Sequence, residues 1–553
     1  MLISKQSAAL ENRVRDLKMD MTSPRLDAGD DGELEIELKL TMSPKSLSKL
    51  LLRLSKTSGA DRTSRKTARI VSTYYDTQDR WLRQQGLTLR VRQKAGKRVQ
   101  TVKSEGSSAL GMFARTEWTT PIESRTPDLT VIKAPAIKAR LGALRHEELI
   151  PLFKTDVKRT TLLMQHTRVP GDSATVELAF DQGRIVSGKK TDQISEVELE
   201  LVKGTTTALL DLAKSISRQV PSILSLGSKV NRGFDLTDGT HPQASMAEKI
   251  SLKKRHSVEE AMVHILRLSL NQLLANRNAA VSGKDIEGVH QARVAIRRIL
   301  SALILFRKYL YGPEVEHIKA EARWLIDILG DARDIDVFIN EVLAAVIQGR
   351  PDDKDLTALI RSAKKARTAA YRRVRSALSS RRYTTAMLDL SSWIEERIWR
   401  NTVTRSKLDA PIGPTSAKLL AKRHRKILKR GKDFADMDSA DRHTVRIALK
   451  KVRYASEFFS ALYPEKRTRP YIAAMRHLQT ALGTANDIAT AEILTESLLK
   501  QVRRGTKDAD TIRSGVGKVL GWHSHAAKEA NADVTALWTS FAKSKPFWPT
   551  SSR

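Results

Sequence analysis

The sequence contains no cysteine. Disulfide bonds, thiolate metal sites and catalysis by a thiol are therefore excluded, and we expect a reducing, cytoplasmic environment. Long hydrophobic runs are also missing, since no stretch approaches the roughly 20 apolar residues that a membrane-spanning helix needs. The N-terminal segment has no signal-peptide core, so we expect neither export nor membrane association.

Aromatic residues make up only 5% of the chain, which limits base stacking, and no motif that reads a nucleic-acid groove is present. The sequence also lacks a GxxxxGK(S/T) phosphate loop and any Ser/His/Asp constellation. These absences argue against a covalent mechanism and against a nucleic acid as the main partner.

Positive charge, by contrast, is abundant. The 553 residues suffice for two to four domains, and they carry a formal net charge of +35. Such a charge predicts attraction to a polyanion, namely nucleic acid, polyphosphate or an anionic membrane. Residues 251–553 hold 56 Lys and Arg against 32 Asp and Glu, so the positive field is mainly C-terminal.

The stretch 33–40, ELEIELKL, alternates charged and apolar residues without a break. Period-2 alternation is typical of a β-strand, so three glutamates and a lysine share one face and four aliphatic side chains the other. A solvated surface strand would show the same pattern. Crowded carboxylates repel one another unless a cation lies among them, which favours a metal, and the lysine is placed to meet an anion that arrives with it.

The same alternation recurs over 87–92, 101–103, 176–181 and 196–201. Strands of this kind build either an antiparallel sheet with one wet face or a closed barrel with a polar lumen. Inside a tunnel, acidic rows could hold Mg²⁺ or Mn²⁺ while basic rows hold a phosphate chain. Start signals and apolar periodicity predict helices over 43–54, 128–144 and 205–218, which we expect to cover the outside of the sheet.

Six short motifs occur in an order that resembles the CYTH domain, also called the triphosphate tunnel metalloenzyme family. The resemblance covers about residues 33–238 and implies an eight-stranded antiparallel β tunnel with flanking helices. The motifs are Glu35-x-Glu37-x-Lys39, Tyr74-Tyr75-Asp76-Thr77, Leu89-Arg90-Val91-Arg92, Thr101-Val102-Lys103, Glu198-x-Glu200 and Ser228-Lys229-x-x-Arg232-Gly233.

The resemblance also implies roles for individual residues. The metal ligands it implies are Glu35, Glu37, Asp181, Glu198 and Glu200, with Mg²⁺ or Mn²⁺ as the cofactor. The triphosphate-binding residues it implies are Lys39, Arg90, Arg92, Lys103, Arg159 and Lys229. We expect Glu35, Glu37, Lys39, Glu198 and Glu200 to carry catalysis, and Glu117 and Glu196 to support them from behind.

Beyond residue 250 helical periodicity replaces the strand pattern, and an internal repeat appears. Residues 289–299 align with 442–452 at an offset of 153, and the same offset carries Phe306 onto Phe459 and Asp334 onto Asp487. At helical spacing, each copy presents a basic stripe opposite an apolar face. A solvated face is the simpler interpretation of one stripe, but two matching stripes with few acids favour an anionic partner.

These stripes resemble the CHAD domain, an all-α module of two repeated helical bundles, over about residues 252–540. The resemblance implies binding of inorganic polyphosphate along a basic groove. The residues carried over are His290, Arg293, Arg297, Arg298, His443, Arg446, Lys450, Lys451 and Arg453. Asp334 and Asp487 are expected to bond to the stripes, and the basic run 418–430 either borders the groove or is solvated.

We therefore expect a mobile leader (1–31), a CYTH-like tunnel domain (32–238), a linker (239–250) and a CHAD-like domain (251–545) with repeats at about 251–400 and 410–545. The leading hypothesis is hydrolysis of inorganic triphosphate to diphosphate and phosphate, with polyphosphate as a second partner. Alternatives are a thiamine triphosphatase, an adenylate cyclase, or a non-catalytic binder of polyphosphate or nucleic acid. Association with polyphosphate granules is left open, and so are the oligomeric state and any cooperation of the two domains on one polyphosphate chain.

Overall fold

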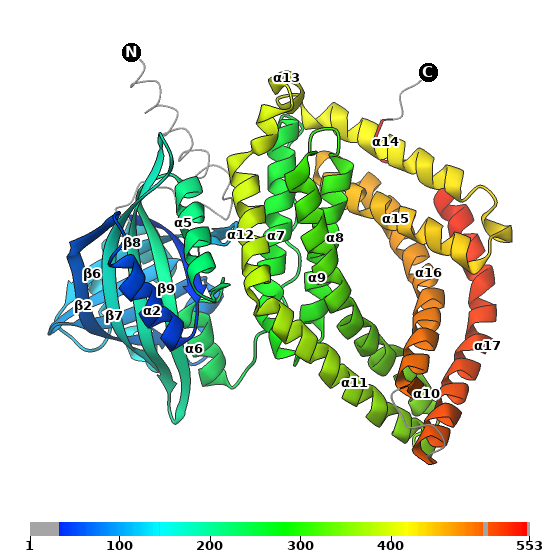
Figure 1. The fold of residues 1–553 in the computed structure, drawn as a ribbon, viewed down its shortest axis with the longest axis horizontal. Coiled ribbons are helices and arrows are strands. Elements are labelled where there is room, and N and C mark those ends of the chain that lie inside the picture. The colour runs from blue at the N-terminus through cyan, green and yellow to red at the C-terminus, as the bar shows by residue number, and fades with distance from the viewer. Residues whose placement is uncertain (1–32, 105, 143, 501–506, 550–553) are drawn as a thin grey trace. The chain divides into compact units, whose positions relative to one another are not determined.

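The chain is described here by a computed structural model that covers residues 33–104, 106–142, 144–500 and 507–549 (Figure 1). The expected leader, 1–31, lies outside these residues. The chain forms two compact units, of which the first comprises Met1–Gln243 with Leu378–Arg397 and the second comprises Ala244–Ala377 with Ile398–Arg553. No helix among the described residues is both long and apolar enough to cross a bilayer.

The first unit is a closed antiparallel barrel of eight strands, as the resemblance to the CYTH domain implies. The strands follow the order β1-β9-β8-β7-β2-β3-β4-β6, and pairing of β6 with β1 closes the ring. Two short strands, β5 (Ser107–Ala109) and β10 (Ile223–Leu224), pair with the ends of β6 and β1, respectively. The eight are β1 (Glu33–Thr41), β2 (Ala60–Asp76), β3 (Leu87–Lys94), β4 (Lys97–Ser104), β6 (Met112–Ile122), β7 (Ile150–Val169), β8 (Asp172–Ser187) and β9 (Lys190–Gly204).

The apolar core of this unit lies outside the barrel. Leu38, Leu199 and Leu178 are direct neighbours across β1, β9 and β8, and all three are fully buried. Helices α2 (Pro44–Leu54) and α5 (Thr206–Gln219) pack on these strands, so the opposite strand faces, which carry the charged residues, line the lumen. Both helices begin at predicted caps, since Ser43 accepts a hydrogen bond from Ser46 N and Thr205 from Ala208 N.

The helix predicted over 128–144 is largely wrong. A 3₁₀ turn, η1 (Leu129–Val131), is followed by a separate short helix, α4 (Pro135–Leu141). Pro135 sits at the start of α4, where a residue without an N–H is tolerated, and its ring keeps the preceding residue out of the helical region.

One end of the lumen is filled by apolar side chains. Tyr74 stacks on Phe153 with ring centroids 4.6 Å apart, and Phe153 meets Phe234 edge to face. Phe234 belongs to α6 (Lys229–Asp238), which contacts β7, β8 and β9. The helix can approach this closely only because residue 233 is glycine, where an added Cβ would lie 2.2 Å from the Phe153 ring.

The first unit also contains α12 (Arg381–Glu396), although the segment Leu378–Arg397 begins 135 residues after Gln243 (378 − 243). This helix packs on α5. Lys214 Nζ lies 2.9 Å from Asp389 Oδ1, and Thr384 Oγ1 donates to the carbonyl oxygen of Ser222 at 2.7 Å. A segment within the sequence of the helical domain therefore completes the tunnel unit.

The second unit is built of helices. Its long helices are α7 (Val258–Ser282), α8 (Glu287–Leu305), α9 (Pro313–Val337), α11 (Lys354–Leu378), α14 (Ile412–Arg430), α15 (Ser439–Phe459), α16 (Glu465–Lys500) and α17 (Lys507–Lys543). A π-helical segment (Phe338–Leu343) leads into the short α10 (Ala344–Gly349), and α13 (Arg405–Leu408) precedes α14.

The two copies of the repeat meet in this unit. Helix α8 carries the first copy and α15 the second, and the two helices are in contact. Phe306 and Phe459, which occupy equivalent positions, pack edge to face with centroids 6.1 Å apart. Contact between equivalent positions indicates that the two halves are related by an approximate two-fold axis at this point.

Candidate functional site

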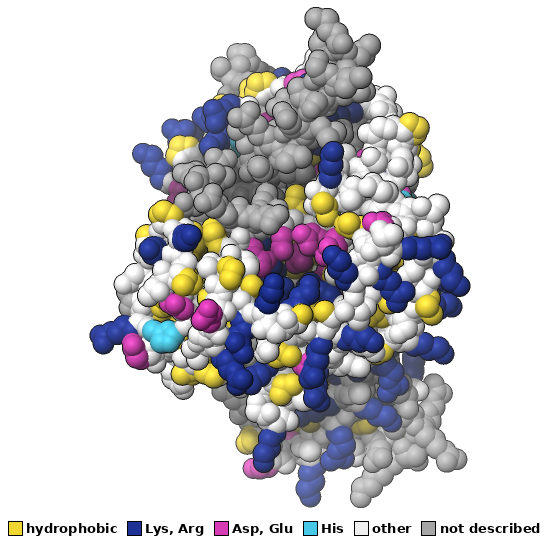
Figure 2. Space-filling view, turned by 90° about the vertical axis from the view of Figure 1, so that its left-hand side faces the viewer, with side chains coloured by type: hydrophobic (Ala, Val, Ile, Leu, Met, Phe, Trp, Pro, Cys, Tyr) yellow, Lys and Arg dark blue, Asp and Glu magenta, His cyan; other side chains and the backbone are white. Residues whose placement is uncertain are grey.

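The lumen of the barrel holds the predicted acidic rows. On β1, Glu37 lies opposite Glu200 and Lys39 lies opposite Glu198. On the other side of β9, Glu196 lies opposite Asp181 of β8. Figure 2 shows acidic side chains gathered in a hollow of the surface, with Lys and Arg side chains beside them. The closed barrel thus concentrates charges that an open sheet would leave in water.

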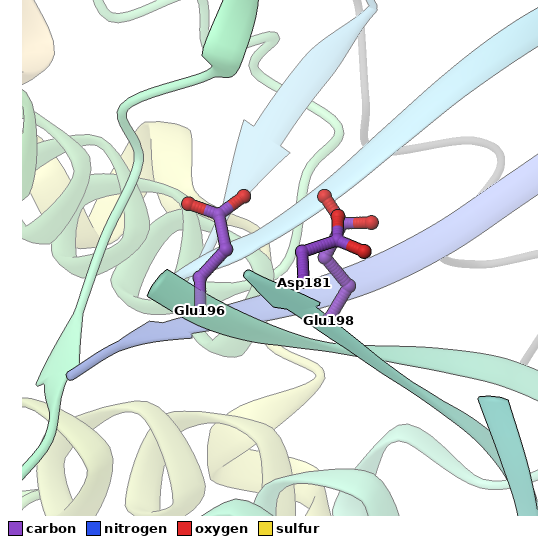
Figure 3. Close-up of side chains that lie close together, drawn as sticks. All are labelled: Asp181, Glu196 and Glu198. Atoms are coloured by element: carbon purple, nitrogen blue, oxygen red, sulfur yellow. The ribbon is translucent and has the colours of Figure 1, made fainter. Parts of the chain in front are cut away.

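Three of these carboxylates form what we call the first acid cluster: Asp181, Glu196 and Glu198. Each offers an oxygen within 4.8 Å of the others. Figure 3 shows their side chains on the same side of β8 and β9. Asp181 and Glu196 are almost fully buried.

The first acid cluster is neutralised by cations of the protein, among them Arg232, whose Nη1 lies 3.9 Å from Glu196 Oε2. Lys229 Nζ lies 2.7 Å from Asp181, 2.6 Å from Glu196 and 2.8 Å from Glu198. Arg159 bridges Asp181 and Glu198, and Lys39 Nζ lies 3.1 Å from Glu198.

These ion pairs lower the pKa values of Glu198 and Asp181. Burial alone would raise the pKa of Glu198, but Lys229, Lys39 and Arg159 hold it well below its usual value. The same balance, with Lys229 and Arg159, lowers the pKa of Asp181. A metal ion at the first acid cluster would have to displace these cations.

A second acid cluster consists of Glu35, Glu37, Glu177 and Glu200. Glu200 lies directly opposite Glu37 on one side and Glu177 on the other. Among the described residues the ion pair found in this cluster joins Glu35 to Lys103, with Nζ and Oε2 2.9 Å apart. Four carboxylates therefore share one close cation.

Burial and the imbalance raise the pKa values of two carboxylates in the second acid cluster. Burial, followed by the charges of Glu35, Glu177 and Glu37, raises the pKa of Glu200 to about 7. Burial likewise raises the pKa of Glu35, helped by Glu117 and Glu37. Carboxylate oxygens are the ligands that Mg²⁺ and Mn²⁺ prefer, so a divalent cation suits this donor set in chemistry and in charge. Among the described residues, however, three acid oxygens lie within 4.8 Å of one another in the first acid cluster and not in the second.

The opposite wall of the lumen is basic. Arg90 Nη2 lies 2.9 Å from Glu117 Oε1, and Lys103 also contacts Glu117. These cations outweigh the effect of burial and lower the pKa of Glu117 to about 2. Glu117 thus holds Arg90 and Lys103 in place.

Arg92 differs from the other lumenal cations. It forms no ion pair within the part of the chain that is described, and its Nε lies 3.5 Å from Ser72 Oγ. The charge of Arg90, then burial and the charge of Arg159, lower the pKa of Arg92 to about 10. A largely buried guanidinium surrounded by other cations is stabilised by an anion.

The structure thus divides the predicted site residues between two places in one lumen. Glu35, Glu37 and Glu200 lie in the second acid cluster, while Asp181 and Glu198 lie in the first. Sequence reasoning missed Glu177 as a member, although the alternation over 176–181 contained the signal. It also did not predict the ion pairs of Glu196, which contacts both Lys39 and Lys229.

The predicted basic stripes of the helical unit occupy α8 and α15. Arg293 lies over Gly330 of α9, since a Cβ at Gly330 would fall 2.7 Å from its Nη1. In the second copy Arg446 approaches Gly483 of α16 in the same way, at 3.8 Å. Equivalent arginines thus lie on equivalent glycines of the neighbouring helix.

Other predicted stripe residues have individual surroundings. Arg298 is 6% exposed and donates to Gln272 Oε1 inside the unit, so it does not lie on an open face. Arg453 pairs with Glu457 at 3.1 Å. Asp334 lies 3.9 Å from Arg293, as expected, whereas the side chain of Asp487 is outside the described residues.

The side chains at the remaining stripe positions are exposed or half-buried. Burial, with the charge of Arg333, lowers the pKa of His290, which favours its neutral form. His443 is exposed, Arg297 and Lys450 are half-buried, and Lys451 lines a pocket discussed below.

Comparison with known proteins gives matches to both units. The family model for the CYTH domain matches residues 33–234, and that for the CHAD domain matches residues 264–496. An inorganic triphosphatase of Haemophilus influenzae is 32% identical over 201 residues, which are 36% of this chain and 54% of that protein. The match therefore spans about half the length of that relative.

Two further proteins are similar over longer stretches. An uncharacterized protein of Mycobacterium tuberculosis is 24% identical over 482 residues, or 81% of this chain and 86% of that protein. The crystal structure of the CHAD domain from the plant Ricinus communis is 30% identical, covers 54% of this chain and 97% of that chain, and has a TM-score of 0.48.

Proposed function

Since the chain carries a CYTH domain followed by a CHAD domain, we propose that its tunnel is a metal-dependent inorganic triphosphatase, which releases diphosphate and phosphate. The observation that carries the proposal is the pairing of an acid-rich wall with a basic wall inside one closed lumen. The similarity to an inorganic triphosphatase over the tunnel domain supports the same substrate class.

Binding of triphosphate follows from the basic wall. Arg92 offers the planar guanidinium that suits phosphate oxygens. Three further cations of the lumen add positive charge, namely Arg90, Lys103 and Arg159. Lys39 and Lys229, held by the first acid cluster, add positive charge from the other side. Negative charge on the transferred phosphoryl group would be met by fixed cations, which is the main requirement for phosphoryl transfer.

The second acid cluster would hold Mg²⁺ or Mn²⁺ through Glu35, Glu37 and Glu200, with Glu177 beside them. When bound, such an ion neutralises phosphate charge and increases the acidity of water. Carboxylates of this cluster can also accept hydrogen bonds from the attacking water and orient it toward the phosphorus. The apolar plug around Phe153 and Phe234 keeps bulk water from that end of the lumen.

The test is phosphate release by the purified chain from inorganic triphosphate, thiamine triphosphate, ATP and long-chain polyphosphate, with Mg²⁺ or Mn²⁺. We expect inorganic triphosphate to be the best substrate and excess chelator to stop the reaction. Cyclic AMP should be assayed with ATP to detect a cyclase. A preference for thiamine triphosphate or ATP, or undiminished activity in chelator, would contradict the proposal.

We further propose that the helical unit binds inorganic polyphosphate along the stripes of α8 and α15. The equivalent placement of Arg293 and Arg446 on two glycines is the observation that favours it. Fluorescence anisotropy with labelled polyphosphate should show affinity that falls steeply with salt, and Arg293→Ala with Arg446→Ala should weaken binding and flatten that dependence. Equal loss of affinity for DNA of the same charge would contradict selectivity for polyphosphate.

A further inference from the structure

A pocket of about 350 Å³ opens between α14, α15 and the end of α8, and we call it the α14 pocket. This volume lies in the range of small-molecule sites. Its floor is apolar, because Leu305, Ile427, Ala448 and Val452 line it and are all nearly or fully buried. The apolar floor is continued by side chains at the wall, Leu419 and Tyr309.

The rim of the α14 pocket is strongly basic. None of the lining residues is acidic, and within the described part of the chain none of the cations below takes part in an ion pair. The eight cations are Arg307, Lys308, Lys418, Lys422, Arg423, Lys426, Arg430 and Lys451.

Burial and repulsion among the rim cations lower the pKa at two positions. Burial, with the charge of Arg307, lowers the pKa of Arg423 to about 10. Burial and the charges of Arg423, Arg430 and Lys426 lower the pKa of Lys451. Cations gathered without counter-charge repel one another, so an anion in the pocket would stabilise the unit.

In the first half of the repeat, the position equivalent to Lys451 does not line the α14 pocket. That position is Arg298, whose guanidinium is buried and is satisfied by Gln272 of α7. Lys451 instead faces the pocket among other cations. The α14 pocket, which also takes lining residues from the end of α8, therefore has no equivalent at the position of Arg298 and is not a copy of the paired stripes.

We propose that the α14 pocket binds a small amphiphilic anion, with its phosphate or carboxylate among the rim cations and its apolar part against Leu305, Ile427 and Val452. An inorganic polyphosphate chain has no apolar part, so the floor would offer it no partner and would only remove water from it. A nucleotide and an aliphatic phosphate share the required chemistry. The site does not depend on the function proposed for the tunnel.

The test is isothermal titration, without divalent cations, of the full-length chain carrying Arg92→Ala and Lys103→Ala, which weaken binding of anions in the tunnel; this chain serves as the wild type for the pocket. The three separate probes are ATP, dodecyl phosphate below its micellar concentration, and inorganic triphosphate. Three variants separate the pocket from general attraction of anions. Arg423→Gln removes a rim cation, and Ala448→Leu fills the floor without changing charge. Arg425→Gln is the matched control, because Arg425 is exposed on the same helix and does not line the pocket.

We expect ATP or dodecyl phosphate to bind the wild type, and the better of the two identifies the source of the ligand. Arg423→Gln and Ala448→Leu should each weaken that binding about tenfold or more, as the loss of a charged hydrogen bond or of ligand space implies, and Arg425→Gln should not. Thermal melting checks that each variant is folded. If Ala448→Leu does not fold, the comparison of Arg423→Gln with Arg425→Gln is sufficient to test the pocket.

Three outcomes would overturn the proposal. The first is that neither organic anion binds the wild type. The second is that both pocket variants bind like the wild type. The third is that inorganic triphosphate binds as well as the organic anions and is weakened equally by Arg423→Gln and Arg425→Gln, which would mean attraction of anions by the surface as a whole.

Discussion

Glu37 on β1 is the direct cross-strand neighbour of Glu200 on β9, and Glu200 in turn faces Glu177 on β8. Like charges in directly opposite positions destabilise a sheet. Three adjoining strands that all carry an acid at this level therefore indicate a place where a cation is needed. The first acid cluster already has its cations in Lys39, Arg159 and Lys229.

A metal at the second acid cluster should raise the melting temperature of the protein. At 100 times its dissociation constant, Mg²⁺ or Mn²⁺ would contribute about 2.7 kcal/mol to the free energy of unfolding. Glu200→Gln should abolish most of this increase, and differential scanning calorimetry measures it. If Glu196→Gln abolished it while Glu200→Gln did not, the metal would belong to the first acid cluster.

In the metal-free protein, Glu200 and Glu117 should make the free energy of unfolding depend on pH in opposite directions. The pKa of Glu200 is about 7 in the folded state against an ordinary 4.5, so the folded state holds the proton more tightly and stability falls as pH rises from 4.5 to 7. Glu200→Gln should remove this fall and stabilise the metal-free chain at pH 8.

Glu117 provides the contrast within the same lumen. Its folded-state pKa of about 2 lies below 4.5, so its contribution to stability is present above pH 4.5 and is lost as pH falls toward 2. Glu117→Gln should flatten the stability curve in that acidic range, and Glu200→Gln should not. Chemical denaturation at each pH, followed by tryptophan fluorescence, measures both curves.

Arg92→Ala should lower kcat for triphosphate by about 10²- to 10³-fold, since it removes a fixed cation that would meet developing charge. Lys94→Ala is the matched control, because Lys94 is exposed two residues further along β3 and loses the same charge. Its kcat should remain within about twofold of the wild type. Equal losses in the two variants would mean that Arg92 has no special position.

Gly330→Ala should weaken binding of long-chain polyphosphate, because the new Cβ would fall 2.7 Å from Arg293 Nη1 and push the guanidinium away. Gly483→Ala is the control, since Arg446 Nη2 lies at 3.8 Å, an ordinary contact distance. We expect a loss of affinity of about tenfold for the first variant and little change for the second. Anisotropy titrations at one salt concentration compare them, and matching affinities would exclude a role for the Arg293 position.

A chain ending at Gln243 should melt at a lower temperature than the tunnel unit of the full chain, because it loses α12 and uncovers α5. A peptide of residues 378–397, added in excess, should bind the truncated chain and restore part of the difference. Unchanged melting in the truncated chain would mean that α12 contributes nothing to this unit.

Period-2 alternation was sufficient to locate the acidic and basic strands of the barrel. It worked for β1, β3 and β9 because their two faces meet different surroundings, with charged side chains inside and apolar packing outside. The caps at Ser43 and Thr205 likewise marked two helices. The resemblance to a CYTH domain followed by a CHAD domain is confirmed by the family models.

Other features depend on contacts that no local pattern reveals. Lys229 was named only through the family resemblance, because it enters the lumen from a helix at its end. The alternation puts Glu177 on the charged face of its strand, but its position beside Glu200 depends on the strand order. Arg298 has the spacing of a stripe residue but is turned inward by Gln272 of another helix. The attachment of α12 to α5 is also a tertiary contact between distant segments.

The discontinuity of the tunnel unit bears on how the chain is made. All eight barrel strands leave the ribosome before α12 is synthesised, and at 5–20 residues per second the intervening stretch takes on the order of ten seconds or more. During that interval the surface of α5 that α12 will cover is exposed to solvent. The nascent barrel is therefore open to aggregation and to chaperones until translation passes Arg397.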